Sequence, residues 1–304
     1  MQFGFVSAIF PELSFNEILS VASREGFDTV EIMCWPVGAA DRKYAGVTHI
    51  DANNLTQTKA EDIRAECQAH KVGISGLGYY PNTLDPDPKV SQVAVDHFKK
   101  VIAAAALLGL TNVNGFVGRD WTKTVDENWP RFLEVWQPIV RCAEEHNVRI
   151  GIENCPMLFT RDEWPGGKNL LSSPAIWRRA FADIPSPCFG LNYDPSHLIL
   201  QDIDSCAPLL EFKDKLFHLH AKDVKIDRAA LNEYGRFDFP LRWHQPCIPG
   251  SGSIDWTLFF STLASSGYAG PVCIEVEDDT FGKSFAGRLQ ALQAARTVLA
   301  PFFV

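Results

Sequence analysis

The chain of 304 residues has no CxxC pair among its eight cysteines. Most of these cysteines fall inside predicted strands or helices, where a free thiol behaves as a small buried hydrophobe. This distribution predicts a reducing compartment, the cytoplasm.

Basic charge and long apolar runs are also scarce. The chain has 28 basic and 37 acidic residues and a formal charge of −9, the wrong sign for holding a phosphate backbone. We therefore expect no nucleic-acid partner. The longest apolar run, residues 101–110, is far shorter than the roughly 20 residues that span a bilayer. The N-terminus has no basic leader and is expected to form a first strand, so we expect neither a membrane anchor nor export.

A glycine-rich phosphate turn is missing after the first predicted strand, where the chain continues as Phe10, Pro11 and Glu12. A doubly wound sheet would need glycines at that turn. Short β-rich runs instead alternate with longer helical patterns eight times. This order predicts the α/β class and a (β/α)₈ TIM barrel that forms a single domain over residues 1–304.

The predicted strands and helices follow the periodicity of apolar residues. The strands are 3–9, 29–34, 72–77, 112–117, 149–154, 188–193, 216–220 and 271–276. The helices are 14–25, 54–70, 89–108, 126–146, 173–183, 203–214, 254–266 and 284–299. Ser14 and Ser173 are expected to begin helices, and Gly26 and Gly109 to end them. The long connections 155–172 and 224–253 follow strands, which in a barrel places them over the active-site mouth.

Four predicted strands stop on a group that can bind a metal ion. These groups are Glu153, Asp194 with His197 close behind, His220, and Glu275. Hard carboxylate oxygens with a single imidazole suit Mn²⁺, Mg²⁺ or Co²⁺ better than a structural zinc site. The sequence therefore predicts a metal site at the strand ends.

Five motifs strengthen this prediction by their order along the chain. They are IEN (152–154), DPSH (194–197), HxHxKD (218–223), PGSGSIDW (249–256) and IEVED (274–278). In this order they resemble the xylose isomerase-like TIM barrels, which include sugar phosphate isomerases and epimerases, ketose 3-epimerases and inosose dehydratases. The resemblance covers nearly the whole chain.

The resemblance implies a single divalent metal ion, with Mn²⁺ expected first and Mg²⁺ or Co²⁺ as alternatives. Its implied ligands are Glu153, Asp194, His220 and Glu275, and His197 is implied to touch a small carbohydrate substrate. Related barrels often associate, so a homo-oligomer is also expected.

Such a site suits a sugar or keto-sugar isomerase or epimerase. A metal ion on the carbonyl oxygen stabilises the enediolate that forms when the adjacent carbon loses a proton. Glu153 and Glu275, expected on opposite sides of the barrel, are the predicted catalytic acid/base pair, one removing the proton and the other returning it. The alternative is a lyase or dehydratase that eliminates a β-leaving group from a keto-sugar, a 3-keto-glycoside or an inosose.

Further residues are candidates for the substrate site. Lys222 and Asp223 are expected to orient His220 or a substrate hydroxyl. Trp35 is expected to stack on a sugar ring, with packing of its loop as an equal alternative. Arg236 is expected to meet substrate hydroxyls or a phosphate.

Weaker expectations concern other ionisable residues. His218 is expected to face away from His220 as a buried structural histidine. Glu277 is expected to lie further out than Glu275, supporting the site indirectly or facing solvent rather than binding the metal. Glu31 is a further, secondary candidate for the site, because a carboxylate at that level often serves the backbone of a neighbouring loop. The histidines without a motif are expected at the solvated surface: His49, His70, His97, His146 and His244.

Two other classes of function stay open. Apurinic-site endonucleases resemble the same barrels, but they need histidines at the ends of early strands, and segments 72–82 and 112–120 contain none. A non-catalytic sugar-binding barrel is the other alternative, and the intact set of predicted ligands argues against it.

Overall fold

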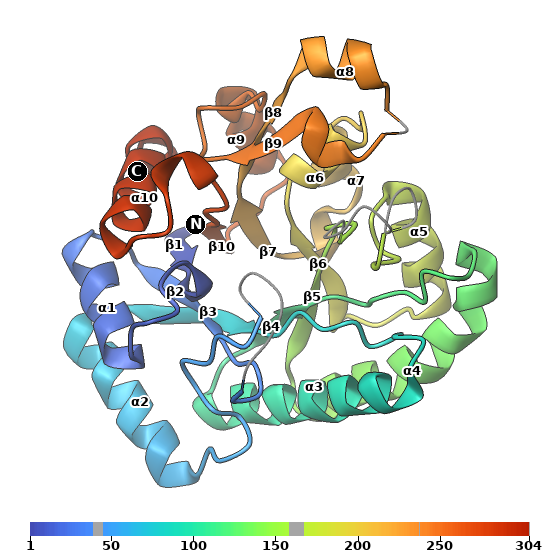
Figure 1. Ribbon diagram of the computed structural model, residues 1–304. Coiled ribbons are helices and arrows are strands. Elements are labelled where there is room, and N and C mark those ends of the chain that lie inside the picture. Colours follow the sequence, from blue (N-terminus) through green and yellow to red (C-terminus); the bar gives the residue numbers. More distant parts are fainter. Residues whose placement is uncertain (39–44, 158–166, 237, 304) are drawn as a thin grey trace.

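A closed ring of eight parallel strands forms the centre of the molecule, as the computed structural model shows in Figure 1. The structure describes residues 1–38, 45–157, 167–236 and 238–303. Around the ring the strands follow the order β1-β10-β7-β6-β5-β4-β3-β2. Because β10 pairs with β1 in parallel, the predicted (β/α)₈ barrel is confirmed.

The barrel strands begin and end close to their predicted positions. They are β1 (Gln2–Val6), β2 (Thr29–Met33), β3 (Gly73–Gly78), β4 (Asn112–Gly115), β5 (Arg149–Glu153), β6 (Phe189–Tyr193), β7 (Leu216–Ala221) and β10 (Pro271–Ile274). In most of them nearly every residue is buried, because the barrel interior covers one face and the helices cover the other.

The helices lie outside the ring (Figure 1). They are α1 (Phe15–Arg24), α2 (Gln57–His70), α3 (Pro88–Leu108), α4 (Val125–Glu145), α5 (Pro174–Asp183), α6 (Ser196–Leu200), α7 (Ala207–Glu211), α8 (Arg228–Tyr234), α9 (Trp256–Ser265) and α10 (Phe285–Leu299). Short 3₁₀ turns are η1 (Ser7–Ile9), η3 (Lys213–Lys215), η4 (Pro240–Arg242), η5 (Asp279–Phe281) and η6 (Ala300–Phe302).

The predicted helix ends have a clear physical basis at two positions. Ser14 caps α1 and forms a reciprocal capping box with Glu17. Gly109 ends α3 at φ 74°, a left-handed conformation that glycine adopts without steric cost. Ser173 stands at the start of α5, but its side chain makes no capping hydrogen bond. Gly26 follows the last turn of α1 at φ 71°.

Large aromatic side chains fill the layer between the helices and the barrel. The fully buried Trp136 of α4 contacts Phe98 of α3, with ring centroids 5.5 Å apart, and Phe189 of β6, at 5.7 Å. Fully burying side chains of this size stabilises a fold by about 1.5–3 kcal/mol each. The rigid layer keeps the strand ends in a fixed arrangement.

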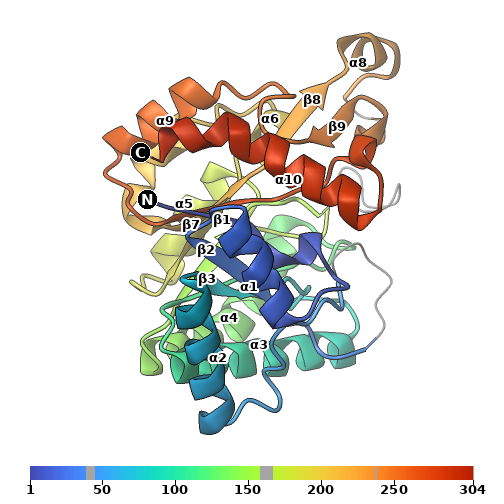
Figure 2. The ribbon, with the colours of Figure 1, turned by 90° about the vertical axis from the view of Figure 1, so that its left-hand side faces the viewer.

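The connection 224–253 was predicted as a loop, and this prediction was wrong in part. It contains an antiparallel hairpin of β8 (Asp223–Ile226) and β9 (His244–Cys247), with α8 between the two strands. The hairpin stands out from the barrel, as Figure 2 shows. The predicted helix 203–214 is also shorter than expected, because only α7 forms there, and α6 was not predicted.

Asp223 anchors the turn that follows this hairpin. Its carboxylate accepts hydrogen bonds from the backbone amides of Gly250, Gly252 and Ile254 and from the indole nitrogen of Trp256. A Cβ on Gly252 would lie 2.2 Å from the Asp223 carboxylate, so only glycine fits there. The PGSGSIDW motif is thus a turn wrapped around a buried carboxylate, and the expectation that Asp223 orients His220 or substrate was wrong.

Candidate metal and active site

Four buried side chains meet at the carboxyl ends of neighbouring strands. Glu153 is the last residue of β5, Asp194 follows β6, His220 lies in β7, and Glu275 follows β10. One donor atom from each lies within 4.8 Å of the others. The structure therefore brings together all four residues that the sequence pointed to as ligands.

Two of these side chains present an unused donor atom to the cluster. Oδ1 of Asp194 accepts hydrogen bonds from the amide and hydroxyl of Ser196, at 2.8 and 2.7 Å. Within the described part of the chain, Oδ2 of Asp194 and Nδ1 of His220 are buried without a hydrogen-bond partner. Buried polar atoms are normally satisfied. Three carboxylates and one imidazole with free donor atoms fit a divalent cation.

His197 lies beside the cluster on the short helix α6. Its Nε2 is 3.2 Å from Oε1 of Glu153 and 3.4 Å from Oδ2 of Asp194. Its exposed fraction is 9%, and it lines a neighbouring pocket together with Cys155 and His244.

Lys222 brings a buried positive charge to the same place. Its Nζ lies 2.7 Å from Oε2 of Glu275, 3.1 Å from Oε2 of Glu277 and 3.3 Å from Oδ2 of Asp194. A buried ammonium needs such partners because losing its hydration is costly. Glu277 was expected further out than Glu275, and it reaches the site through Lys222 rather than as a member of the cluster.

The two glutamates of the cluster have opposite shifts in acidity. Burial tends to raise the pKa of Glu153, but hydrogen bonds from His197 and His220 lower it far below its usual range. Burial raises the pKa of Glu275 to about 7, and the charge of Lys222 only partly opposes this. Although burial disfavours the charged form of His220, the charge of Glu31 raises the pKa of His220 well above its usual value.

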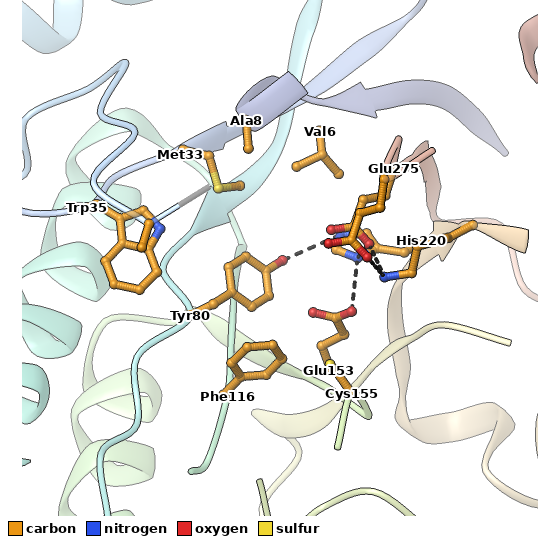
Figure 3. A pocket seen from close by; sticks show the side chains of 13 residues that line it. Val6, Ala8, Met33, Trp35, Tyr80, Phe116, Glu153, Cys155, His220 and Glu275 are labelled. Carbon is orange, nitrogen blue, oxygen red and sulfur yellow. Dashed lines mark hydrogen bonds and ion pairs between the residues drawn. The ribbon is translucent and has the colours of Figure 1, made fainter. Parts of the chain in front are cut away.

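A pocket opens onto these groups (Figure 3). Glu153, His220, Lys222 and Glu275 form its polar side. The opposite side is apolar and aromatic: Val6, Ala8, Met33, Trp35, Tyr80 and Phe116. A polar cluster facing an aromatic wall can fix the hydroxyls of a sugar while covering its apolar face.

Of the other two candidate substrate residues, one lines the pocket and one does not. Trp35 lines the pocket, as Figure 3 shows, and its stacking on a sugar ring stays a prediction. Arg236 does not line it; its guanidinium pairs with Asp202 at 3.1 Å and lies over the ring of Trp243. Arg236 was predicted in a loop over the mouth of the barrel, but it lies in the segment between the two hairpin strands and outside the lining of this pocket.

Three expectations about the strand ends were wrong. His218 and His220 are two residues apart, so they share the inner face of β7, and their ring centroids are 5.6 Å apart. Glu31 contacts side chains inside the barrel rather than a loop backbone, because its Oε2 lies 2.6 Å from Nε2 of His220. Glu153 and Glu275 are not diametrically opposed either, since only β6 and β7 separate β5 from β10.

The five histidines expected at the surface do not all lie there. His97 is buried on the inner side of α3, where its Nε2 lies 2.7 Å from the carbonyl oxygen of Cys34. His49 contacts the hydroxyl of Ser7 and the carbonyl of Phe10. The helical periodicity of α3 could have indicated the burial of His97, because Val101 and Ala94 lie on the same face.

A comparison with family models shows which family the chain belongs to. Residues 19–300 match the model described as xylose isomerase-like TIM barrel. The chain belongs to this family. As a member of the xylose isomerase-like TIM barrels, it is an enzyme of the sugar isomerase, epimerase and dehydratase superfamily in its broad class.

Curated relatives fall into two groups. The chain is 25% identical to the uncharacterized protein YfiH of Bacillus subtilis (strain 168), over 98% of this chain and 99% of that protein. It is 33% identical to an inosose dehydratase of Halalkalibacterium halodurans, but this match covers only 30% of each chain.

Solved structures of the xylose isomerase-like type share the fold at low identity. IolI with a bound zinc atom superposes with a TM-score of 0.72 at 18% identity, over 100% of this chain and 99% of that one. A D-psicose 3-epimerase with D-tagatose, from Clostridium cellulolyticum H10, gives a TM-score of 0.69 at 17% identity and covers 99% of both chains. None of the described helices is long and apolar enough to cross a membrane.

Proposed function

We propose that this protein is a divalent-metal-dependent isomerase or epimerase of a sugar or keto-sugar, working by proton removal next to a carbonyl group. The observation that carries the proposal is the buried cluster of Glu153, Asp194, His220 and Glu275, whose donor atoms lie within 4.8 Å of one another. Three of the four, all but Asp194, line the pocket. The zinc-bound IolI structure and the epimerase structure support it as members of the same fold.

The four clustered side chains would hold one divalent ion, and we keep Mn²⁺ as the first choice. When bound, such an ion supplies a Lewis acid that offsets negative charge developing on a carbonyl oxygen. The donor set contains three carboxylates and one imidazole, which suits Mn²⁺, Mg²⁺ or Co²⁺. The same set does not exclude zinc, which IolI binds.

Glu153 and Glu275 are the proposed acid/base pair. They come from β5 and β10 and approach His220 from two directions, with Oε1 of Glu153 at 3.6 Å and Oε2 of Glu275 at 3.7 Å from Nδ1. A substrate carbon between the two carboxylates would expose one face to each. One carboxylate accepts the proton, and delivery by the other on the opposite face inverts the carbon.

His197 and Lys222 complete the proposed substrate site. His197 Nε2 touches the carboxylates of both Glu153 and Asp194, so the imidazole can fix their orientation and donate to a substrate oxygen. Lys222 lines the pocket next to Glu275, where its ammonium can bind a substrate hydroxyl or oxyanion. Trp35 would cover the apolar face of the sugar.

Dehydration of a keto-sugar or an inosose is the second candidate. The inosose dehydratases among the relatives favour it, although each match covers about a third of the chain. Elimination begins with the same proton removal, and it also needs an acid for the departing oxygen. Lys222 is the buried ammonium beside Glu275 that could serve this step.

We further propose a reducing, cytoplasmic setting. All eight cysteines are free thiols, which is the usual state in a reducing cytoplasm. We also propose that the chain forms one domain over residues 1–304 and assembles as a homo-oligomer that acts on a small carbohydrate without a nucleic-acid or membrane partner.

Solvent exchange tests the proposal directly. The Mn²⁺-loaded protein is incubated in D₂O with ketoses, inososes and 3-keto-glucosides, and the products are analysed by proton NMR after metal removal. Deuterium next to the carbonyl supports enolisation, and an epimer or an unsaturated ketone separates the two candidates. Glu153→Gln and Glu275→Gln should each lower exchange by at least about 100-fold, within the range of general acid–base catalysis. Exposed Glu144→Gln is the matched control, and near-normal exchange in either site variant would refute the two-glutamate mechanism.

A further inference from the structure

We propose that Glu31 is a positioning residue that holds His220 in one tautomer and one orientation, with Nδ1 aimed at the metal cluster. The inference rests on the proposed metal-dependent function, which assigns no role to Glu31. Glu31 lies in β2, on the far side of the His220 ring from Glu153 and Glu275, and its exposed fraction is 0%.

The shortest polar contact of His220 is with this carboxylate. Oε2 of Glu31 lies 2.6 Å from Nε2 of His220, the length of a strong charge-assisted hydrogen bond. Because a carboxylate only accepts, Nε2 must carry the proton. In the neutral imidazole, the form that binds a metal, Nδ1 then has its lone pair free, and this atom faces Oε1 of Glu153 and Oε2 of Glu275.

Further hydrogen bonds inside the barrel hold the Glu31 carboxylate in the orientation that meets His220. Tyr80 donates its hydroxyl proton to Oε1 of Glu31. The same hydroxyl accepts a hydrogen bond from the side-chain amide of Asn192, at 3.1 Å. The Asn192 amide nitrogen and the Tyr80 hydroxyl also lie near Nε2 of His220, at 3.1 and 3.4 Å, but Oε2 of Glu31 at 2.6 Å is the nearest acceptor.

His218 fixes the orientation of the Asn192 amide in turn. Its Nδ1 lies 3.0 Å from Oδ1 of Asn192, and its Nε2 lies 3.0 Å from the hydroxyl of Ser75. Since Oδ1 can only accept, Nδ1 of His218 donates and Ser75 donates to Nε2. In this assignment the Asn192 amide donates to Tyr80, Tyr80 donates to Glu31, and Glu31 accepts from His220. Buried hydrogen-bond networks of this kind are rigid when their members are satisfied.

A metal ion is a less suitable occupant for Glu31. One donor atom each of Glu31, His218 and His220 also lies within 4.8 Å of the others. However, each of these atoms already has a hydrogen-bond partner inside the barrel. The free atoms of Asp194 and His220 lie instead in the other cluster. Glu31 therefore acts through His220 rather than on the metal itself.

Metal affinity tests this role without relying on turnover. Loss of an outer partner of a metal-binding histidine typically weakens metal binding about 10–100-fold. We expect Glu31→Gln, which keeps the shape and one acceptor oxygen, to bind Mn²⁺ about 10-fold more weakly by titration calorimetry. Glu31→Ala, which removes the acceptor, should approach 100-fold. Glu144→Gln, which removes a carboxylate that accepts from Ser186, should bind as tightly as the wild type.

A spectroscopic measurement separates positioning from general damage to the fold. In the Zn²⁺-loaded, ¹⁵N-labelled protein, we expect His220 to show a protonated Nε2 and a metal-shifted Nδ1. In Glu31→Gln the proton on Nε2 should lose its strong downfield shift, while the amide spectrum of distant residues stays unchanged.

The outcomes are distinct from those of the function test. Binding of Mn²⁺ within twofold of wild type in both Glu31 variants, or a metal-bound Nε2 in the NMR spectrum, overturns the inference. A wild type that binds no divalent metal overturns it together with the proposed metal dependence. A wild type that binds Mn²⁺ through a Glu31-dependent His220 but enolises no substrate leaves the inference standing and defeats only the proposed reaction.

Discussion

Nζ of Lys222 lies 2.7 Å from Oε2 of Glu275, inside the same pocket that the metal cluster lines. The same ammonium is 3.3 Å from Oδ2 of Asp194, an atom with no hydrogen-bond partner among the described residues. The positive charge of Lys222 and a bound cation therefore compete for the same carboxylates, so Lys222 should weaken metal binding.

Replacing Lys222 by methionine should thus affect binding and turnover in opposite directions. Removing the lysine charge should tighten Mn²⁺ binding several-fold. Repulsion between two positive charges at this range costs on the order of 1 kcal/mol or more. Loss of the substrate contact should lower kcat/KM by at least about 10-fold. Calorimetry and initial rates give the two numbers. Lys225→Met, on the exposed side of the hairpin, is the control, and a weaker metal affinity in Lys222→Met would contradict the competition.

The anchored turn at Asp223 gives a stability prediction. Asp223→Asn replaces an acceptor of several N–H groups by an amide that must direct its own N–H groups at some of them. Since hydrogen bonds to a charged group are worth about 1.5–3 kcal/mol each, we expect a loss of at least about 2 kcal/mol in the free energy of unfolding. Urea denaturation measures it. Asp227→Asn, at the exposed cap of α8, should cost less than about 1 kcal/mol, and equal losses in both variants would contradict the anchor.

His97 makes stability depend on pH. Burial lowers the pKa of His97, and Lys100 adds to this while the carbonyl of Cys34 and the charge of Asp51 oppose it. The unfolded chain binds a proton near pH 6.5 that the folded protein binds only at lower pH. Stability is therefore kept above the unfolded pKa and is lost as the pH falls below it.

The expected size of this effect is set by one titrating group. Between pH 7.5 and 5.5, wild type should lose up to about 1 kcal/mol more unfolding free energy than His97→Gln. His70→Gln, at the end of α2, should lose as much as wild type. If His97→Gln follows the wild-type curve over this range, the buried histidine is not responsible.

The four clustered side chains could be predicted because each one lies at or next to the end of a strand. Glu153, Asp194, His220 and Glu275 follow runs of apolar residues, and parallel strands in a barrel bring their ends to one rim. The strand ends pointed to these residues, and the resemblance to the family implied that they hold one metal ion. The same local reasoning placed Ser14 and Gly109 at helix ends, where the backbone requirement is also local.

The network behind the ligands could not be predicted in this way. The contact of Glu31 with His220 joins β2 and β7, which are three places apart around the ring, and depends on how the barrel closes. The hairpin of β8 and β9 was missed because its strands are separated by the 17 residues from 227 to 243 and pair outside the barrel. Arg236 was misplaced for the same reason, since the hairpin determines where it lies.

Metal removal should destabilise the whole barrel. The clustered carboxylates of Glu153, Asp194 and Glu275 are buried close together, and only Lys222 and two histidines offset their charge within the described residues. A ligand that binds only the folded state adds about 2.7 kcal/mol at a free concentration 100 times its Kd. We therefore expect the Tm of the EDTA-treated protein to rise by several degrees on adding Mn²⁺. Asp194→Asn should abolish most of this rise while Asp204→Asn, at the exposed start of α7, keeps it. An unchanged Tm in the wild type at millimolar Mn²⁺ would mean that the cluster is balanced by protonation and by Lys222 alone, and the metal-dependent reaction would have to be abandoned.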